Sequence, residues 1–112
     1  MLEDQAKISL DALLNIRAPG TYLIKVDGDS MEGAGIFSGD ILIVDKGLDP
    51  VGGNVVIALI DREPTVKYLT FTAGMPVLRS ANPKYPPRFI LENNEFEVWG
   101  VVTYSIRDHD RN

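Results

Sequence analysis

The chain has 112 residues, with 11 Lys and Arg against 16 Asp and Glu, and a formal net charge of −5 at pH 7. This length predicts a single domain, and a content of 45% hydrophobic and 24% charged residues is typical of a globular protein rather than a disordered one. The acidic balance argues against a protein whose main task is to grip a phosphate backbone. Cysteine is absent, which excludes disulfides and thiolate sites, and no apolar run approaches the roughly 18–20 residues of a membrane span, so we expect a cytoplasmic protein.

A short helix is expected near the N-terminus, over residues 8–16. Ser9 is a suitable N-cap, and Asp11 lies in the first turn, where the helix dipole favours a negative charge. One face of this helix is apolar, with leucines at 10, 13 and 14. Pro19-Gly20 is expected to end the helix, so residues 1–20 form an N-terminal extension.

The rest of the chain reads as short strands and turns. Residues 54–60 are almost entirely apolar, as in a strand buried on both faces, and a turn over 61–64 would join them to an antiparallel partner over 65–71. Further strands are expected over 22–26, 41–44, 76–80, 89–91 and 97–106. This pattern predicts a mainly β domain of folded or barrel-like sheets.

One connection in this β region is rich in proline. The loop over 82–88 is also basic, and we expect a surface connection, with a polyproline ligand as the alternative. Acidic residues concentrate in segment 27–49 and basic residues in segment 61–88. We expect these to be solvated loops, with self-association or docking through the two regions of opposite charge as the alternative.

Ser30 lies where the first predicted strand breaks into a loop, in Gly28-Asp29-Ser30-Met31. Glycines nearby permit tight turns, which would expose the serine and leave backbone N–H groups available to an oxyanion. The match to a nucleophile elbow is imperfect, because position 32 is Glu and no helix is predicted to follow. Taken alone, a serine in this setting is more often a turn residue.

Two side chains are candidates for activating this serine. The single histidine, His109, lies in a polar tail of the kind that frays, which disfavours a Ser-His-Asp triad. Lys67 lies in a predicted strand, where alternation puts Thr65 and Leu69 on its face, and burial there would lower its pKa and leave a neutral amine. The alternative is that Lys67 reaches solvent or lies on an edge strand. The residue pattern alone does not bring Ser30 and Lys67 together.

No metal or cofactor site is expected. Asp27-Gly28-Asp29 begins like a calcium loop, but Met31 and Glu32 stand where that loop needs a ligand and a glycine. Phosphate-binding and dinucleotide-binding glycine patterns are also missing.

Five segments taken together resemble the LexA/UmuD family of self-cleaving serine peptidases. They follow the family's order across residues 22–106 and are Val26-Asp27-Gly28-Asp29-Ser30-Met31, Ser38-Gly39-Asp40-Ile41-Leu42-Ile43-Val44-Asp45, Gly53-Asn54-Val55-Val56-Ile57-Ala58, Thr65-Val66-Lys67 and Val98-Trp99-Gly100-Val101-Val102. The resemblance implies a Ser-Lys peptidase domain of folded antiparallel strands over 21–107, followed by a polar tail over 108–112. It assigns Ser30 as nucleophile, Lys67, 37 positions later, as general base, and the backbone N–H groups of Ser30 and Met31 as oxyanion donors.

Within the family, Gly-Asp-Ser-Met and the segment 98–102 resemble UmuD more than the LexA repressor. The resemblance implies an SOS mutagenesis protein in the processed form of UmuD. Such a protein is a homodimeric accessory subunit of an error-prone, UmuC-like Y-family polymerase, which contacts the RecA filament and meets nucleic acid only through partners. The alternative is the C-terminal dimerisation and self-cleavage domain of a LexA-like or phage-type repressor. A type I signal peptidase shares the Ser-Lys chemistry but requires a membrane anchor, which is not expected here.

The scissile bond of the family is a Cys-Gly or Ala-Gly bond in an arm upstream of the serine. Ala73-Gly74, an Ala-Gly pair of this chain, lies downstream of Ser30. Ala18-Pro19-Gly20 lies close to the serine and carries a proline that would hinder backbone binding. We therefore expect a dyad without its own cleavable arm or helix-turn-helix domain, and cleavage of an arm in trans stays open.

Overall fold

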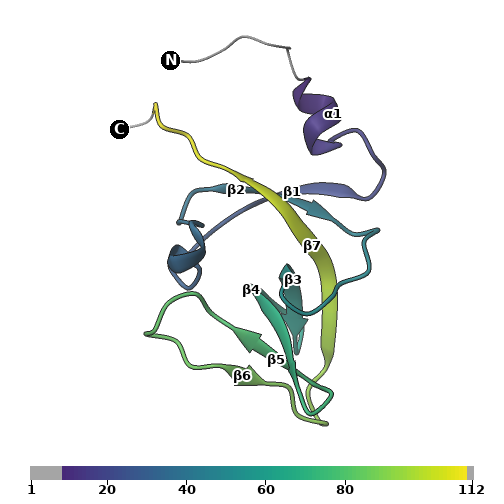
Figure 1. The fold of residues 1–112 in the computed structure, drawn as a ribbon, viewed down its shortest axis with the longest axis vertical. Coiled ribbons are helices and arrows are strands. Elements are labelled where there is room, and N and C mark those ends of the chain that lie inside the picture. Colours follow the sequence, from purple (N-terminus) through teal and green to yellow (C-terminus); the bar gives the residue numbers. More distant parts are fainter. Residues whose placement is uncertain (1–8, 111–112) are drawn as a thin grey trace.

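The computed structural model describes residues 9–110, which form one seven-stranded antiparallel sheet with a short helix before it (Figure 1). The strand order is β1-β2-β7-β3-β4-β5-β6. The helical elements are α1 (Leu10–Leu14) and a one-turn 3-10 helix, η1 (Glu32–Ala34); the strands are β1 (Thr21–Lys25), β2 (Ile41–Asp45), β3 (Val55–Ile60), β4 (Glu63–Thr72), β5 (Met75–Arg79), β6 (Arg88–Phe89) and β7 (Phe96–Ile106). The predicted mainly β fold with one short N-terminal helix is confirmed. No helix in the described part of the chain is long and apolar enough to cross a membrane.

The helix α1 is shorter than the sequence predicts. Ser9 is its N-cap, as expected, and the serine side chain accepts a hydrogen bond from the backbone N–H of Ala12 at 3.4 Å. The helix ends at Leu14 rather than at Pro19-Gly20, because Asn15 adopts the left-handed conformation with φ 56°. Residue 8, at the other end of the predicted range, lies outside the described residues.

The turn between β3 and β4 is also shorter than predicted. Asp61 and Arg62 both have positive φ, 48° and 69°, which is the backbone of a two-residue hairpin turn. Glu63 and Pro64 therefore lie in β4, paired with the last two residues of β3, rather than in a turn over 61–64. The strand expected at 89–91 is likewise displaced to Arg88–Phe89, which pairs with β5.

The long strand β7 joins the two halves of the sheet. It pairs with β2 along one edge and with β3 along the other, and each pairing contains a register shift. Such irregularities bend a strand and increase its local twist, and Figure 1 shows β7 curving along the whole molecule. Two separate groups of buried side chains result. We call the group formed by Met31, Ile36, Leu42, Val44 and Ile57 the upper core.

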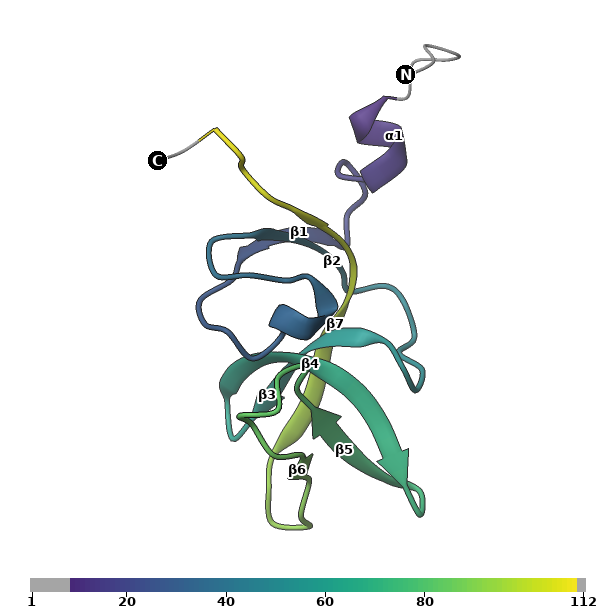
Figure 2. The same cartoon turned by 60° about the vertical axis from the view of Figure 1, so that its left-hand side comes forward.

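The upper core lies beneath the connection between β1 and β2, which contains η1. Figure 2 shows this connection beside the hairpin of β3 and β4. The apolar side chains of Met31 and Ile36 are 2% and 5% exposed and hold the connection against the sheet. Residues 26–40, which carry Ser30, are therefore fixed by burial although they contain no strand.

Candidate active site

Ser30 lies in the connection that leaves the sheet after β1. The two ends of this connection are joined by backbone hydrogen bonds from Val26 N–H to the carbonyl of Asp40 at 2.8 Å and from Gly39 N–H to the carbonyl of Val26 at 2.9 Å. Gly28 turns the backbone with φ 120°, a value that L side chains rarely adopt. Met31 is buried in the upper core, so the serine before it is held at the surface of a cleft. The 3-10 helix η1 begins two residues after Ser30, although the sequence predicted no helix there.

Lys67 lies on β4, an interior strand between β3 and β5. The alternative that it lies on an edge strand is therefore wrong. Alternation along β4 is as predicted, because Leu69 joins one group of buried side chains, whereas Val66 and Tyr68 pack against the upper core. Lys67 is half-buried, and this burial lowers the pKa of its ammonium below the ordinary value of 10.5. The sequence argument for a lysine with a lowered pKa is confirmed in direction.

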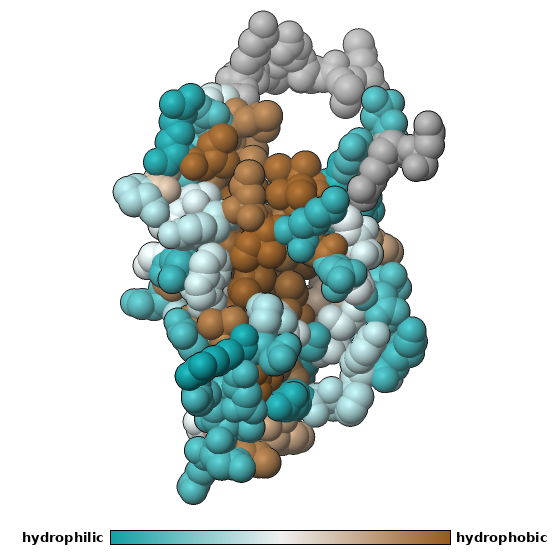
Figure 3. Space-filling model, turned by 180° about the vertical axis from the view of Figure 1, so that it is seen from behind, coloured by the Kyte–Doolittle hydropathy of each residue, from teal (hydrophilic) through white to brown (hydrophobic). Residues whose placement is uncertain are grey.

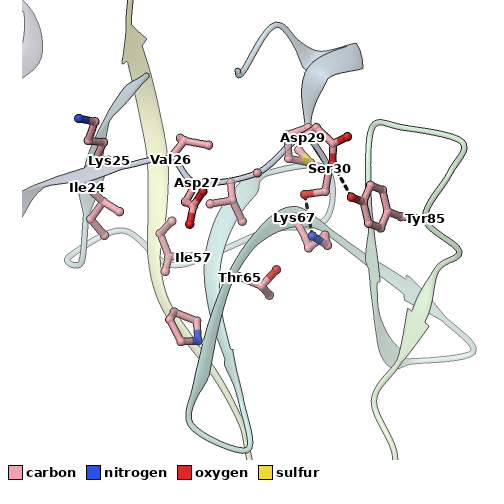
Figure 4. Close-up of a pocket in the computed structure, with 14 residues that line it drawn as sticks. Ile24, Lys25, Val26, Asp27, Asp29, Ser30, Ile57, Thr65, Lys67 and Tyr85 are labelled. Atoms are coloured by element: carbon pink, nitrogen blue, oxygen red, sulfur yellow. Dashed lines mark hydrogen bonds between the residues drawn. The ribbon is translucent and has the colours of Figure 1, made fainter. Parts of the chain in front are cut away.

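The structure brings Ser30 and Lys67 together. Lys67 Nζ donates a hydrogen bond to Ser30 Oγ at 2.8 Å, as Figure 4 shows. Both side chains line a cleft of about 520 Å³, whose walls also include Val26 and Asp27 after β1, and Pro64 on β4. When the lysine is neutral, the same contact lets its lone pair accept the serine proton. The distance between the two side chains is within the range that a serine nucleophile and a general base require.

The backbone beside the serine offers two free donors. Among residues 9–110, neither the N–H of Ser30 nor that of Met31 donates a hydrogen bond to the protein. Adjacent unpaired N–H groups next to a nucleophile are what an oxyanion requires. The two donors named from the resemblance are thus available, and their role stays a proposal.

The residue before the serine belongs to a polar network that the sequence did not predict. The Asp29 carboxylate accepts hydrogen bonds from the hydroxyl of Tyr85 and from Lys84 Nζ, the latter at 3.0 Å. The hydrogen bond from Tyr85 is the main cause of a lowered Asp29 pKa, with a further contribution from Lys84. Tyr85 also lines the cleft of the dyad (Figure 4).

Lys84 and Tyr85, which bind the Asp29 carboxylate, both belong to the proline-rich connection over 82–88. It runs over the surface, as predicted, but it also reaches the nucleophile's loop. The side chains of Asn82, Lys84 and Tyr85 can all form hydrogen bonds, but local sequence patterns do not reveal their partners.

The other sequence candidates are placed apart from the dyad. His109 is exposed beyond the end of β7 and does not line the cleft. No group of three or more residues capable of binding a metal occurs within residues 9–110.

Comparison with known proteins identifies the family of this chain. The Peptidase S24-like family model matches residues 2–103. Protein MucA of Salmonella typhimurium is 42% identical over 96 residues, which cover 84% of this chain and 65% of MucA. Protein SamA of Salmonella typhimurium is 37% identical over 99 residues, covering 88% of this chain and 68% of SamA. The LexA repressor of Xanthomonas citri is 41% identical over 86 residues, covering 77% of this chain and 40% of the repressor.

The chain therefore spans about two thirds of the length of MucA and two fifths of that of the LexA repressor. The family match covers both the loop of Ser30 and the strand of Lys67, so it includes the whole cleft described above. The match across almost the whole chain, with a mainly antiparallel β sheet, shows that this protein belongs to the Peptidase S24-like family, the family of LexA and UmuD.

Proposed function

We propose that this protein is a serine peptidase in which Ser30 is the nucleophile and Lys67 the general base. The observation that carries the proposal is the 2.8 Å contact between Lys67 Nζ and Ser30 Oγ, made by a half-buried lysine with a lowered pKa. A lysine made less basic by burial spends more time as the neutral amine that can take a proton. The cleft around the pair has a volume of about 520 Å³ and is lined by residues at the end of β1 and at the start of β4, between which we expect the substrate peptide to bind.

The chemistry follows from this geometry. Ser30 Oγ attacks the carbonyl carbon of the scissile bond while its proton passes to Lys67 Nζ. The negative charge that forms on the carbonyl oxygen is stabilised by the N–H groups of Ser30 and Met31. The C–N bond then breaks, and Lys67 returns the proton to the leaving amine, which leaves an ester on Ser30. Water, deprotonated by Lys67, hydrolyses that ester and restores the serine.

In the cell we propose a UmuD-like role as a cytoplasmic accessory subunit of an error-prone, UmuC-like Y-family DNA polymerase in the SOS response. Two features support this role: the similarity to MucA and SamA, and the Gly-Asp-Ser-Met sequence at the nucleophile. The natural substrate would be an arm of UmuD type, cut at an Ala-Gly or Cys-Gly bond. Contacts with the RecA filament belong to the same proposal.

A homodimer completes this proposal. Figure 3 shows apolar side chains gathered on the back of the molecule, and exposed apolar residues include Leu10 and Leu13 on α1, Leu23 on β1 and Ile106 on β7. Exposed apolar side chains that gather on one face are typical of a protein interface.

A second candidate is the self-cleaving C-terminal domain of a LexA-like repressor. The 41% identity to the LexA repressor of Xanthomonas citri, nearly equal to that of MucA, favours it. A pull-down with a Y-family polymerase catalytic subunit separates the two: retention of the subunit supports the UmuD-like role, and its absence from the bound fraction supports the repressor.

The catalytic proposal is tested by supplying an arm-bearing UmuD homologue, whose own serine is replaced by alanine, and following cleavage of its arm. We expect Ser30→Ala and Lys67→Ala to abolish cleavage by this protein. Lys46→Gln is the matched control, because Lys46 lies outside the cleft and its Nζ is 4.7 Å from the centre of the Trp99 ring. If the Ser30 and Lys67 variants cut the arm as fast as the unmodified protein, the dyad is wrongly assigned.

A further inference from the structure

The segment over residues 81–85, which we call the clamp loop, forms hydrogen bonds with the loop that carries Ser30. The N–H of Ala81 donates to the carbonyl of Ser30 at 2.8 Å, and the N–H of Gly33 donates to the carbonyl of Ala81 at 2.6 Å. The side-chain Nδ2 of Asn82 donates to the carbonyl of Asp29 at 2.9 Å. Two consecutive carbonyls, those of Asp29 and Ser30, therefore both accept hydrogen bonds from the clamp loop, and the carbonyl of Asp29 also accepts a longer one, at 3.4 Å, from the N–H of Glu32.

Fixing these two carbonyls also fixes two N–H groups. A trans peptide is planar, so its C=O and N–H point in opposite directions from the same rigid unit. The carbonyl of Asp29 shares its peptide with the N–H of Ser30, and the carbonyl of Ser30 shares its peptide with the N–H of Met31. These are the two N–H groups that find no acceptor within residues 9–110. The clamp loop thus sets the direction of both proposed oxyanion donors.

The side chain of Asn82 is itself held in place for this contact. Its Oδ1 accepts a hydrogen bond from the backbone N–H of Lys84 at 3.0 Å, which orients the amide so that Nδ2 faces Asp29. The two loops also approach closely, because a Cβ added at Gly33 would lie 2.5 Å from the carbonyl oxygen of Ala81. The clamp is therefore a close fit of two backbones, with Asn82 supplying its one side-chain contact to the backbone of the nucleophile's loop.

We propose that Asn82 is a positioning residue that orients the Ser30 and Met31 N–H groups toward the developing oxyanion through its hydrogen bond to the carbonyl of Asp29. The inference rests on the proposed peptidase activity and adds a residue 52 positions beyond the nucleophile to its machinery. Removing the hydrogen bond would slow the chemical step and leave the dyad contact in place.

The test uses two substitutions at this position. Asn82→Asp keeps the acceptor for the Lys84 N–H but replaces the donor by an oxygen that repels the carbonyl of Asp29. Asn82→Ala removes the donor without adding charge. The matched control is Asn94→Asp, because Asn94 makes the same kind of contacts in a loop outside the cleft: Oδ1 accepts from Leu91 N–H at 3.0 Å, and Nδ2 donates to Asp61 at 3.1 Å.

The probe is diisopropyl fluorophosphate, whose phosphoryl oxygen occupies the position of an oxyanion. Ser30 Oγ forms a bond to phosphorus, the P–F bond breaks, fluoride leaves, and the serine proton passes to Lys67. The adduct is counted by intact-protein mass spectrometry, and its formation rate is measured over a range of pH. Because labelling needs no natural substrate, the whole chain is tested as it is.

We expect both Asn82 variants to be labelled at least tenfold more slowly than the unmodified protein, since loss of one oxyanion donor slows an enzyme by about 100- to 1000-fold and here the donors are only misdirected. The midpoint of the pH–rate profile of Asn82→Ala should stay where it is, because the surroundings of Lys67 are unchanged. Asn94→Asp should be labelled within about twofold of the unmodified rate. If unfolding explained the slower labelling, the labelling rate of each variant would instead fall in step with its thermal unfolding midpoint, and the control would be affected as well.

Each of the following results would overturn the inference. Equal labelling of the unmodified protein and both Asn82 variants refutes the role of Asn82 and leaves the dyad intact. A slower rate in Asn82→Ala that comes only from a shifted pH midpoint shows that Asn82 acts on Lys67 rather than on the oxyanion donors. Absence of labelling in the unmodified protein, or undiminished labelling in Ser30→Ala, refutes the proposed peptidase and this inference with it.

Discussion

Replacing Asp40 by alanine should remove much of the stability of this protein. Asp40 is 1% exposed, and its carboxylate accepts two hydrogen bonds from Arg107, from Nε at 3.0 Å and from Nη2 at 3.0 Å. It also accepts the backbone N–H of Phe37 at 2.9 Å. These contacts tie the residue that follows β7 to the end of the nucleophile's connection, so their loss affects both regions.

The magnitude follows from what each partner loses. Breaking a buried ion pair by deleting one member costs about 3–5 kcal/mol, because the remaining charge is left uncompensated. Arg107 has a side chain that is 38% exposed and keeps a hydrogen bond to the carbonyl of Gly35 at 2.7 Å, so water can solvate it after Asp40 is removed. We therefore expect the lower end, about 3 kcal/mol, from a total that is about 5–15 kcal/mol for a domain.

The assay is urea unfolding of Asp40→Ala followed by the fluorescence of Trp99. This is the single tryptophan of the chain, and its ring packs edge-on against Tyr22 with centroids 5.0 Å apart, so unfolding changes its environment. The control is Glu95→Gln, which removes an exposed ion pair to Arg62 at 3.6 Å and should cost less than about 0.5 kcal/mol. A loss below about 1 kcal/mol in Asp40→Ala would refute the reasoning that this buried pair fixes the connection.

Two further predictions concern the site. The rate of Ser30 labelling by diisopropyl fluorophosphate should rise with pH to a plateau, with the midpoint of the rise below 10.5. The reason is that burial lowers the pKa of Lys67 and only the neutral amine accepts the proton. A rate that falls with rising pH contradicts the general-base role. Gly33→Ala should force the clamp loop away, because the added Cβ would lie 2.5 Å from the carbonyl oxygen of Ala81. Urea unfolding should show that the free energy of unfolding falls by about 1–3 kcal/mol, and labelling of Ser30 should be slower. A variant with unchanged stability and labelling rate would show that the close approach is unnecessary.

Local patterns were enough to predict most of the sheet. The run from Val55 to Ile60 is apolar at every position, and this property alone predicts a strand buried on both faces. The errors lie at the ends of elements, at Asn15 and at Asp61-Arg62, where positive φ values decide where the backbone turns. A residue other than glycine adopts the left-handed conformation because of its surroundings in the folded protein. The neighbouring sequence therefore did not indicate it.

Residue patterns alone singled out Ser30 and Lys67 as candidates, but their pairing was expected only through the resemblance. A separation of 37 residues does not by itself predict contact between Ser30 and Lys67. Pairing of β4 with both β3 and β5 places the lysine, and burial of Met31 places the serine. The hydrogen bond from Asn82 to Asp29 joins residues 53 positions apart and depends on the same long-range packing. It was therefore not predicted from a loop that was interpreted as a surface connection.

The position of the nucleophile is set by residues distant from it in the chain. Residues 26–40 contain no strand, and ordering each residue of such a segment costs about 1–2 kcal/mol of conformational entropy. That cost is opposed at three places: Met31 and Ile36 are buried in the upper core, Arg107 holds Asp40 at one end, and the clamp loop holds the peptides around Ser30. Because each of these acts on a different part of the segment, weakening any one should disturb the geometry of Ser30 before the sheet unfolds. The geometry of the proposed site therefore depends on the connection of β5 to β6 and on the residue that follows β7, as well as on Ser30 and Lys67 themselves.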